Sequence, residues 1–315
     1  MRAPPQASAS ADSETPSTAW IESLVGHCPY TATPKQECTD LKAKAIQACN
    51  EHRANPCMES AIQFEAKGCD PKITSDMAEA TLEYACGLGS WTSCAWLSGS
   101  LFKSGNESKR QKAFEVAQKT CLHGEAEGCV NAGSMLAWRY GNGKPKDSDL
   151  TQAMDWAKRG CDLGSMRGCN AYALGLIQRN RVSDRSDARE LLESQCVKGF
   201  QPSCVTLGHG YSTGAFGSPD SDRTSSLWRG ACACGESDGC LGTAHILFER
   251  HDKKAALALV RHACANNNYQ ACAGLGKMYL EGTDVGRDPA RARRYFEQAC
   301  RLNDGESCET LKTME

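Results

Sequence analysis

Small and large apolar residues recur at helical spacing along the chain, in units of roughly equal length. Each unit has a small residue followed three positions later by a large one, and polar residues lie between. The small residues are Ala61, Ser98, Gly133, Ala173, Gly208, Ala244 and Gly276, and the large ones are Phe64, Leu101, Leu136, Leu176, Tyr211, Leu247 and Tyr279. Residues three or four apart share one face of a helix. The pattern predicts a first helix in each unit, and its small residue lets a neighbouring helix approach closely.

Pairs of cysteines eight residues apart mark the same units. The pairs are Cys49–Cys57, Cys86–Cys94, Cys121–Cys129, Cys161–Cys169, Cys196–Cys204, Cys232–Cys240, Cys264–Cys272 and Cys300–Cys308. The small residue comes four positions after each second cysteine, so we expect the first helix to begin at that cysteine. A period near 36 residues, repeated this often, is typical of a solenoid.

A second helix is predicted before each first cysteine. Alanine comes eight residues before it in most units, as at Ala113 and Ala292, and a large apolar residue comes five before it, as at Trp156 and Tyr295. Three residues after the first cysteine come residues that tolerate left-handed backbone, namely Gly89, Gly124, Gly164, Gly199, Gly235, Asn267 and Asn303.

The glycine turn makes a disulfide within each pair feasible. An unbroken helix would place the two Cα atoms about 12 Å apart, whereas a disulfide needs less than about 7 Å. We therefore predict that all eight pairs are structural disulfides joining one hairpin to the next. Cys28–Cys38 is expected to close an N-terminal cap, and the pairing of Cys69 and Cys234 stays open.

The predicted organisation is a disordered tail or linker at 1–18, a cap segment at 19–48 and the repeat solenoid at 49–315. We expect an all-α, right-handed superhelical solenoid of about seven hairpins, closed by a short helix at 309–315. The eighth unit has Lys312 at the small position and no second helix after it. This departure fits either a polar terminal unit that caps the solenoid or a truncated chain.

The most regular unit carries a family resemblance. It runs Leu275-Gly276-Lys277-Met278-Tyr279, then Gly282, Asp288-Pro289, Ala292, Tyr295-Phe296, Ala299-Cys300 and Gly305-Glu306-Ser307-Cys308. This unit resembles the Sel1-like, TPR-like repeat, and its cysteine pair is similar to that of the Helicobacter cysteine-rich proteins. The resemblance covers residues 41–315. It implies an adaptor or scaffold, although some cysteine-rich members are described as penicillin-binding proteins or weak β-lactamases.

Composition narrows the compartment and the class of partner. The 315 residues include 20 cysteines and carry a net charge of −2, with 36 basic and 38 acidic residues intermixed. The sequence lacks the stripe of basic residues that is expected of a nucleic-acid-binding protein. No apolar run reaches the roughly 20 residues that a membrane span needs. Such cysteine usage is typical of an oxidising compartment. We expect a bacterial protein that is periplasmic, at the cell surface or secreted, whose signal or lipid anchor was removed upstream.

Catalytic and metal motifs are weak. Ser100 and Lys103 match the S-x-x-K of β-lactamases, but no KTG follows and Ser212-Thr213-Gly214 only approximates it. We interpret this match as chance, and expect no catalytic residue, cofactor or metal. A β-lactamase-like hydrolase remains the alternative function and rests on the resemblance alone. His209 and His245 fall at one position of consecutive units, as a ligand pair or as two polar groove residues.

The inner surface of the solenoid is the predicted binding site for a protein or peptide partner. By analogy with related repeats, positions one, five, eight and nine after each second cysteine should line it. These include Met58, Ile62, Phe102, Val130, Trp138, Leu174, Ile177, Val205, His209, Leu241, His245, Phe248 and Lys277. Rigid repeats hold peptides or helices on such concave stripes. The competing interpretation is that curvature buries some of these residues between units.

Overall fold

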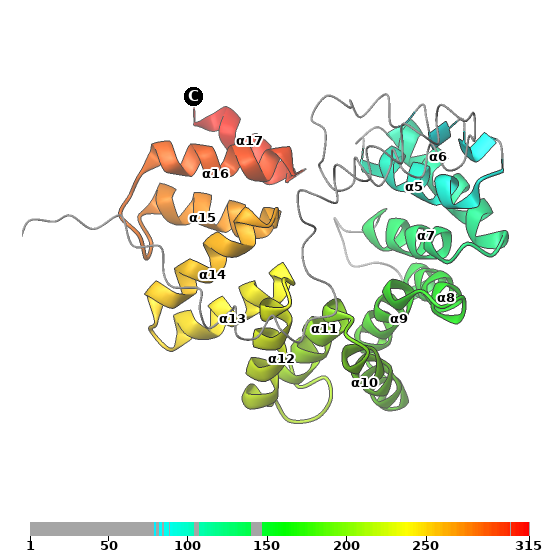
Figure 1. Ribbon diagram of the computed structural model, residues 1–315, viewed down its shortest axis with the longest axis horizontal. Helices are drawn as coiled ribbons and strands as arrows, with labels where there is room; N and C mark the ends of the chain where they lie inside the picture. Colours follow the sequence, from blue (N-terminus) through cyan, green and yellow to red (C-terminus); the bar gives the residue numbers. More distant parts are fainter. Residues whose placement is uncertain are drawn as a thin grey trace, which may run out of the picture.

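The computed structural model describes residues 79, 82–83, 85–87, 89–103, 107–139, 147–302 and 304–314. Its helices are α5 (Trp91–Lys103), α6 (Glu107–Leu122), α7 (Ala126–Arg139), α8 (Asp147–Asp162), α9 (Met166–Arg179), α10 (Val182–Val197), α11 (Gln201–Ser212), α12 (Ser221–Ala233), α13 (Ser237–Glu249), α14 (Lys253–Ala265), α15 (Tyr269–Glu281), α16 (Pro289–Arg301) and α17 (Gly305–Thr313). Consecutive helices pack as hairpins that follow one another along a curve, with α7, α9 and α11 on its inner side (Figure 1). The all-α solenoid is confirmed.

Several predictions fall outside the described residues. They are the tail at 1–18, the cap at 19–48, Cys28–Cys38, Cys49–Cys57, Met58, Ile62 and Cys69. The backbone of Trp138 belongs to α7, but its side chain lies outside the described part. Among the helices that are described, none is long and apolar enough to cross a bilayer.

The first helices begin one turn before the second cysteine, and not at it as predicted. Ser165, Asn268 and Asp304 are N-caps whose side chains accept hydrogen bonds from the backbone N–H three residues on, at 3.2, 3.0 and 3.1 Å. Each cap satisfies an N–H group that has no partner within the helix. The last helix therefore spans Gly305–Thr313 and not 309–315. The core pattern starts at the cysteine, but capping sets the helix boundary.

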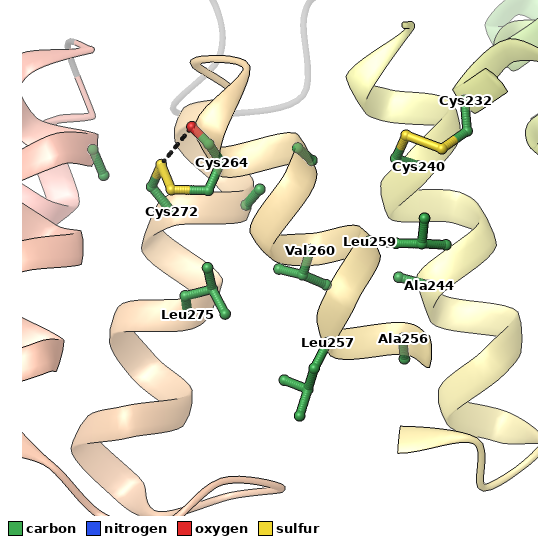
Figure 2. Packing of buried hydrophobic residues seen from close by; sticks show 13 residues of the cluster. Cys232, Cys240, Ala244, Ala256, Leu257, Leu259, Val260, Cys264, Cys272 and Leu275 are labelled. Carbon is green, nitrogen blue, oxygen red and sulfur yellow. Dashed lines mark hydrogen bonds between the residues drawn. A yellow bond between two sulfur atoms is a disulfide. The ribbon is translucent and has the colours of Figure 1, made fainter. Parts of the chain in front are cut away.

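Disulfides join the second helix of one hairpin to the first helix of the next. The described pairs are Cys86–Cys94, Cys121–Cys129, Cys161–Cys169, Cys196–Cys204, Cys232–Cys240, Cys264–Cys272 and Cys300–Cys308. Figure 2 shows two of them, Cys264–Cys272 between α14 and α15 and Cys232–Cys240 between α12 and α13. The glycines after the first cysteines have φ between 87° and 93°, and Asn267 has φ 62°. The predicted left-handed turn is therefore present at these joints.

The residue just before each second cysteine controls how closely a joint closes. Where it is Gly128, Gly168 or Gly239, the paired Cα atoms are 4.5, 4.3 and 4.5 Å apart. Where it is serine or alanine, they are 4.7 to 4.8 Å apart. A Cβ at Gly168 would lie 2.7 Å from the backbone nitrogen of Cys161. Glycine therefore permits the tighter contact, a role that the sequence pattern did not suggest.

The predicted small positions have the proposed packing role. A Cβ added at Gly276 would lie 2.7 Å from the ring of Phe296, and one at Gly208 would lie 2.6 Å from Nε1 of Trp228. Both aromatic residues belong to the second helix of the same hairpin. Figure 2 shows the core between α13, α14 and α15, where Leu259 and Leu275 are almost completely buried. Each hairpin thus buries its apolar face against its own partner helix and the next hairpin.

Cys234 also forms a disulfide. Each of the other described cysteines belongs to one of the seven joint pairs, so the partner of Cys234 lies outside the described residues. Cys234 is the C-cap of α12 and directly precedes Gly235, the turn residue of its joint. In the described part of the chain no cysteine is a free thiol, and Cys232-Ala233-Cys234 therefore has both of its sulfur atoms in disulfides.

Candidate partner-binding surface

The first helices expose the face that lies opposite their core contacts. Positions zero, three, four and seven after the second cysteine face the core, and a helix turns about 100° per residue. The opposite face is therefore centred on positions two, five and nine. We call the side chains at these three positions the inner face. The described residues at position nine are exposed, whereas most of those at position two are half-buried. Figure 1 places the first helices α7, α9 and α11 along the inner side of the curve. Position five holds Leu174, His209, His245 and Lys277, and all but Leu174 are exposed.

Predicted residues at positions one and eight lie at the flanks of the helices. Phe102, Ile177, Val205, Leu241 and Phe248 are half-buried. Most of them pack against the cores of their hairpins, as Phe248 does beside Ala244 and Ala256. Their side chains point roughly 90° away from the centre of the exposed face, so they fill the seams between neighbouring first helices.

Val130 departs furthest from its prediction. It is 3% exposed, and a Cβ atom added at Gly160 of α8 would lie only 3.1 Å from its methyl carbon Cγ2. Because its neighbour on α8 is a glycine, Val130 enters the contact between α7 and α8. It belongs to the core and not to an open surface.

Trp96 belongs to the inner face, although the sequence interpretation omitted it. It lies two residues after Cys94 on α5, and 49% of it is exposed. Position two lies three residues before position five, so both share one helical stripe. This three-residue spacing is the feature of the sequence from which Trp96 could have been predicted to lie on the same face. A half-exposed tryptophan on a rigid helix is the kind of side chain that anchors protein interfaces.

Charged groups follow the stripe toward the C-terminus. The Nδ1 atom of His245 lies 3.6 Å from the carboxylate of Glu249, and Lys277 donates to Glu306 of α17 at 2.8 Å. This hydrogen bond to the Glu306 carboxylate raises the pKa of Lys277. Lys277 therefore links α15 to the last helix, and the carboxylate of Glu306 offsets part of its positive charge. Across the described residues no group of three or more metal-binding side chains gathers, and His209 and His245 are both exposed.

The β-lactamase-like motif is not assembled into a site. Ser100 and Lys103 lie on α5 beside Leu101, a core residue that is 1% exposed. The hydroxyls of Ser212 and Thr213, at the end of α11, each donate to the backbone carbonyl of His209 at 2.9 Å. The two parts of the motif lie in different hairpins, and local backbone contacts hold the second part. This arrangement offers no support for a hydrolase.

A family model identifies two of the hairpins. The model of the Sel1 repeat matches residues 126–165 and 270–304, which hold α7 with α8 and α15 with α16. The chain carries Sel1 repeats. The Sel1 match falls on the unit from which the resemblance was drawn, and on a second unit four joints earlier in the chain. No curated protein matches the chain in sequence.

Solved structures share the Sel1 fold at low sequence identity. A Sel1 repeat protein from Oxalobacter formigenes is 14% identical, with a TM-score of 0.50, over 81% of this chain and 96% of that one. A protective antigen of uropathogenic Escherichia coli strains is 18% identical, with a TM-score of 0.46, over 75% of this chain. The match spans 51% of the antigen, so it covers about half of that longer protein. The similarity to the Oxalobacter protein supports the fold alone, and the resemblance to the Helicobacter proteins stays a prediction.

Proposed function

We propose that this Sel1-repeat protein is an exported interaction module that holds a protein or peptide partner along its inner face. The observation that carries the proposal is the exposure of Trp96 on α5, His209 on α11, His245 on α13 and Lys277 on α15, at inner-face positions of these first helices. These side chains are not needed for packing, because the opposite side of each helix forms the core. Repeat solenoids present such rigid, extended surfaces to partners.

The chemistry of the stripe favours a mixed contact and not a purely apolar one. Trp96 supplies one large aromatic surface near the N-terminal end of the described solenoid, while Glu249 and Glu281 at position nine are exposed carboxylates. Half-buried Phe248 lies at the seam beside them. A partner segment with an apolar anchor at one end and basic or polar residues at the other would match this distribution.

Photo-crosslinking tests where the partner lies. We expect a photo-reactive residue at His209 or His245 to give discrete adducts in the native compartment, because both positions open onto the inner face. The same residue at Val197, which is 88% exposed at the end of α10, is the matched control and should give none. Trp96→Ala should then weaken binding of the captured partner roughly 30-fold, as expected for an aromatic anchor. Adducts from Val197 but not from His245 would place the interface elsewhere.

Export is tested by the oxidation state of the cysteines. The seven described joint disulfides suit an oxidising compartment, and such bonds are rare where glutathione keeps thiols reduced. Peptide mapping of freshly isolated protein, alkylated without reduction, should recover each pair as one linked loop and Cys234 as unalkylated. Recovery of most of these cysteines as alkylated free thiols would contradict both the staples and the compartment.

A further inference from the structure

Two tyrosines occupy equivalent places in the repeat. Tyr211 on α11 and Tyr279 on α15 each lie seven residues after the second cysteine, and they are 6% and 4% exposed. The backbone carbonyl of each accepts a hydrogen bond from the aspartate that caps the next helix. The distances are 3.1 Å for Asp220 to Tyr211 and 2.8 Å for Asp288 to Tyr279. The two tyrosines therefore have the same local frame.

An arginine lies at the same register in both frames. Arg223 donates to the hydroxyl of Tyr211 at 3.0 Å, and its guanidinium lies 5.2 Å from the ring centre. Arg291 hydrogen-bonds the hydroxyl of Tyr279, and its guanidinium lies 5.7 Å from that ring centre. Each arginine also pairs with the capping aspartate of its own helix, at 3.4 and 3.2 Å. Three of the four residues in each cluster thus correspond in kind and in contact.

The fourth residue is acidic in the first cluster and basic in the second. Glu193 of α10, eighteen residues before Tyr211, accepts a hydrogen bond from the tyrosine hydroxyl at 3.0 Å. Eighteen residues before Tyr279, Arg261 of α14 donates to that hydroxyl at 3.0 Å. The first cluster has one more carboxylate than guanidinium, and the second has one more guanidinium than carboxylate. In the described chain, nothing accepts the proton of the Tyr279 hydroxyl.

The two arginine side chains of the second cluster face solvent. Arg261 and Arg291 are both exposed, and α15 lies between their helices α14 and α16 (Figure 1). Within the part of the chain that the structure describes, no carboxylate lies within 4.0 Å of Arg261. Burial raises the pKa of Tyr279, but hydrogen bonds from Arg291 and Arg261 outweigh it, and the pKa lies below its ordinary value. Both guanidiniums therefore act on the same tyrosine hydroxyl.

We propose that Tyr279 and Arg261, supported by Arg291, form a binding site for an external carboxylate group between α14 and α16. One oxygen of the carboxylate would accept the proton of the Tyr279 hydroxyl, and the other would accept from the guanidinium of Arg261. The bound carboxylate would accept from Tyr279 as the Glu193 carboxylate accepts from Tyr211. This correspondence is the reason for expecting a carboxylate ligand. Charge-assisted hydrogen bonds of this kind are the strong ones. Tyr279 lies at a core position of the first helix α15 and both arginines lie on second helices, so the site is independent of the inner-face proposal.

Reciprocal charge swaps test the site in the full-length chain. The probe is a hexaglutamate peptide, titrated calorimetrically at constant ionic strength, with hexaglutamine as the neutral control. Arg261→Glu should lower affinity for hexaglutamate at least tenfold, because the new carboxylate fills the site from within. Glu193→Arg should add a second binding site of similar affinity beside Tyr211. Arg189→Glu, an exposed residue of α10, is the control for net charge and should change affinity less than twofold.

Competition identifies the source of the carboxylate. Displacement of the peptide by acetate would show that free carboxylates suffice, and resistance to acetate would point to an acidic protein segment; both agree with the proposal. Better competition by inorganic phosphate than by acetate at equal charge concentration would overturn the carboxylate assignment. Equal binding by the wild type, Arg261→Glu and Arg189→Glu would overturn the site. Circular dichroism of each variant should remain that of the wild type, since all the exchanged side chains reach solvent.

Discussion

Replacing Phe296 with alanine should destabilise the C-terminal hairpin by about 3 to 5 kcal/mol. Phe296 is 1% exposed, and its cluster joins Tyr279 of α15, Ala292 of α16 and the apolar residues Leu311 and Met314 near the chain end. Its removal leaves a cavity that a glycine on the facing helix cannot fill. Chemical denaturation followed by circular dichroism measures the loss. Hydrogen exchange should rise first in residues 269–313, because neighbours in a solenoid share only local contacts.

The facing Gly276 provides an internal check on that prediction. In the wild type, Gly276→Ala should be destabilising, because its methyl group would come within 2.7 Å of the buried ring of Phe296. In the Phe296→Ala background the same change should be neutral or favourable, so the two effects should not add. Arg294→Ala, an exposed change on the same helix, should stay within about 0.5 kcal/mol. Additive effects at positions 276 and 296 would contradict the close contact.

Removing one joint disulfide in mid-array, by Cys161→Ser with Cys169→Ser, should cost about 2.5 kcal/mol in the chain-entropy model. This bond joins α8 to α9 beside the tight contact of Gly168 with the Cys161 backbone. The bond constrains one joint, so hydrogen exchange should increase mainly in residues 121–204. The hairpins at 264–308 should stay protected, since they share no contact with that joint.

The terminal pair is the matched control for the mid-array joint. Cys300→Ser with Cys308→Ser should loosen mainly α17, which packs chiefly on α16 and is also held to α15 by the ion pair of Lys277 with Glu306. If instead loss of the Cys161–Cys169 bond unfolds every hairpin in a single transition, the array is one cooperative unit. The nearest-neighbour description of the solenoid would then be wrong.

Local regularities of the sequence were sufficient for the hairpins and their joints. The eight-residue cysteine spacing, together with glycine or asparagine three residues after the first cysteine, predicted the turns now seen at Gly164 and Asn267. The small position predicted the close approach at Gly276. These features depend on contacts between residues that are near in sequence or one helix apart, so a repeating pattern records them.

The candidate surface was only partly predictable. His209, His245 and Lys277 are exposed, whereas Val130 lies in the core and the exposed Trp96 was not among the predicted residues. A hydrophobic pattern separates a buried face from an exposed one. It does not say whether a flanking residue meets glycine or a large side chain on the next helix.

By itself, the sequence determined that this chain is a disulfide-joined helical repeat protein, because periodic packing and turn formation act over one repeat. Only the tertiary structure decided which flanking side chains close the seams and which remain open. It also brought Arg261, Tyr279 and Arg291 together from three helices. In the sequence, the change from Glu193 in one repeat to Arg261 at the equivalent position of another is one difference among many between charged residues. Its meaning depends on which hydroxyl each side chain reaches, and that contact exists only once the hairpins have packed.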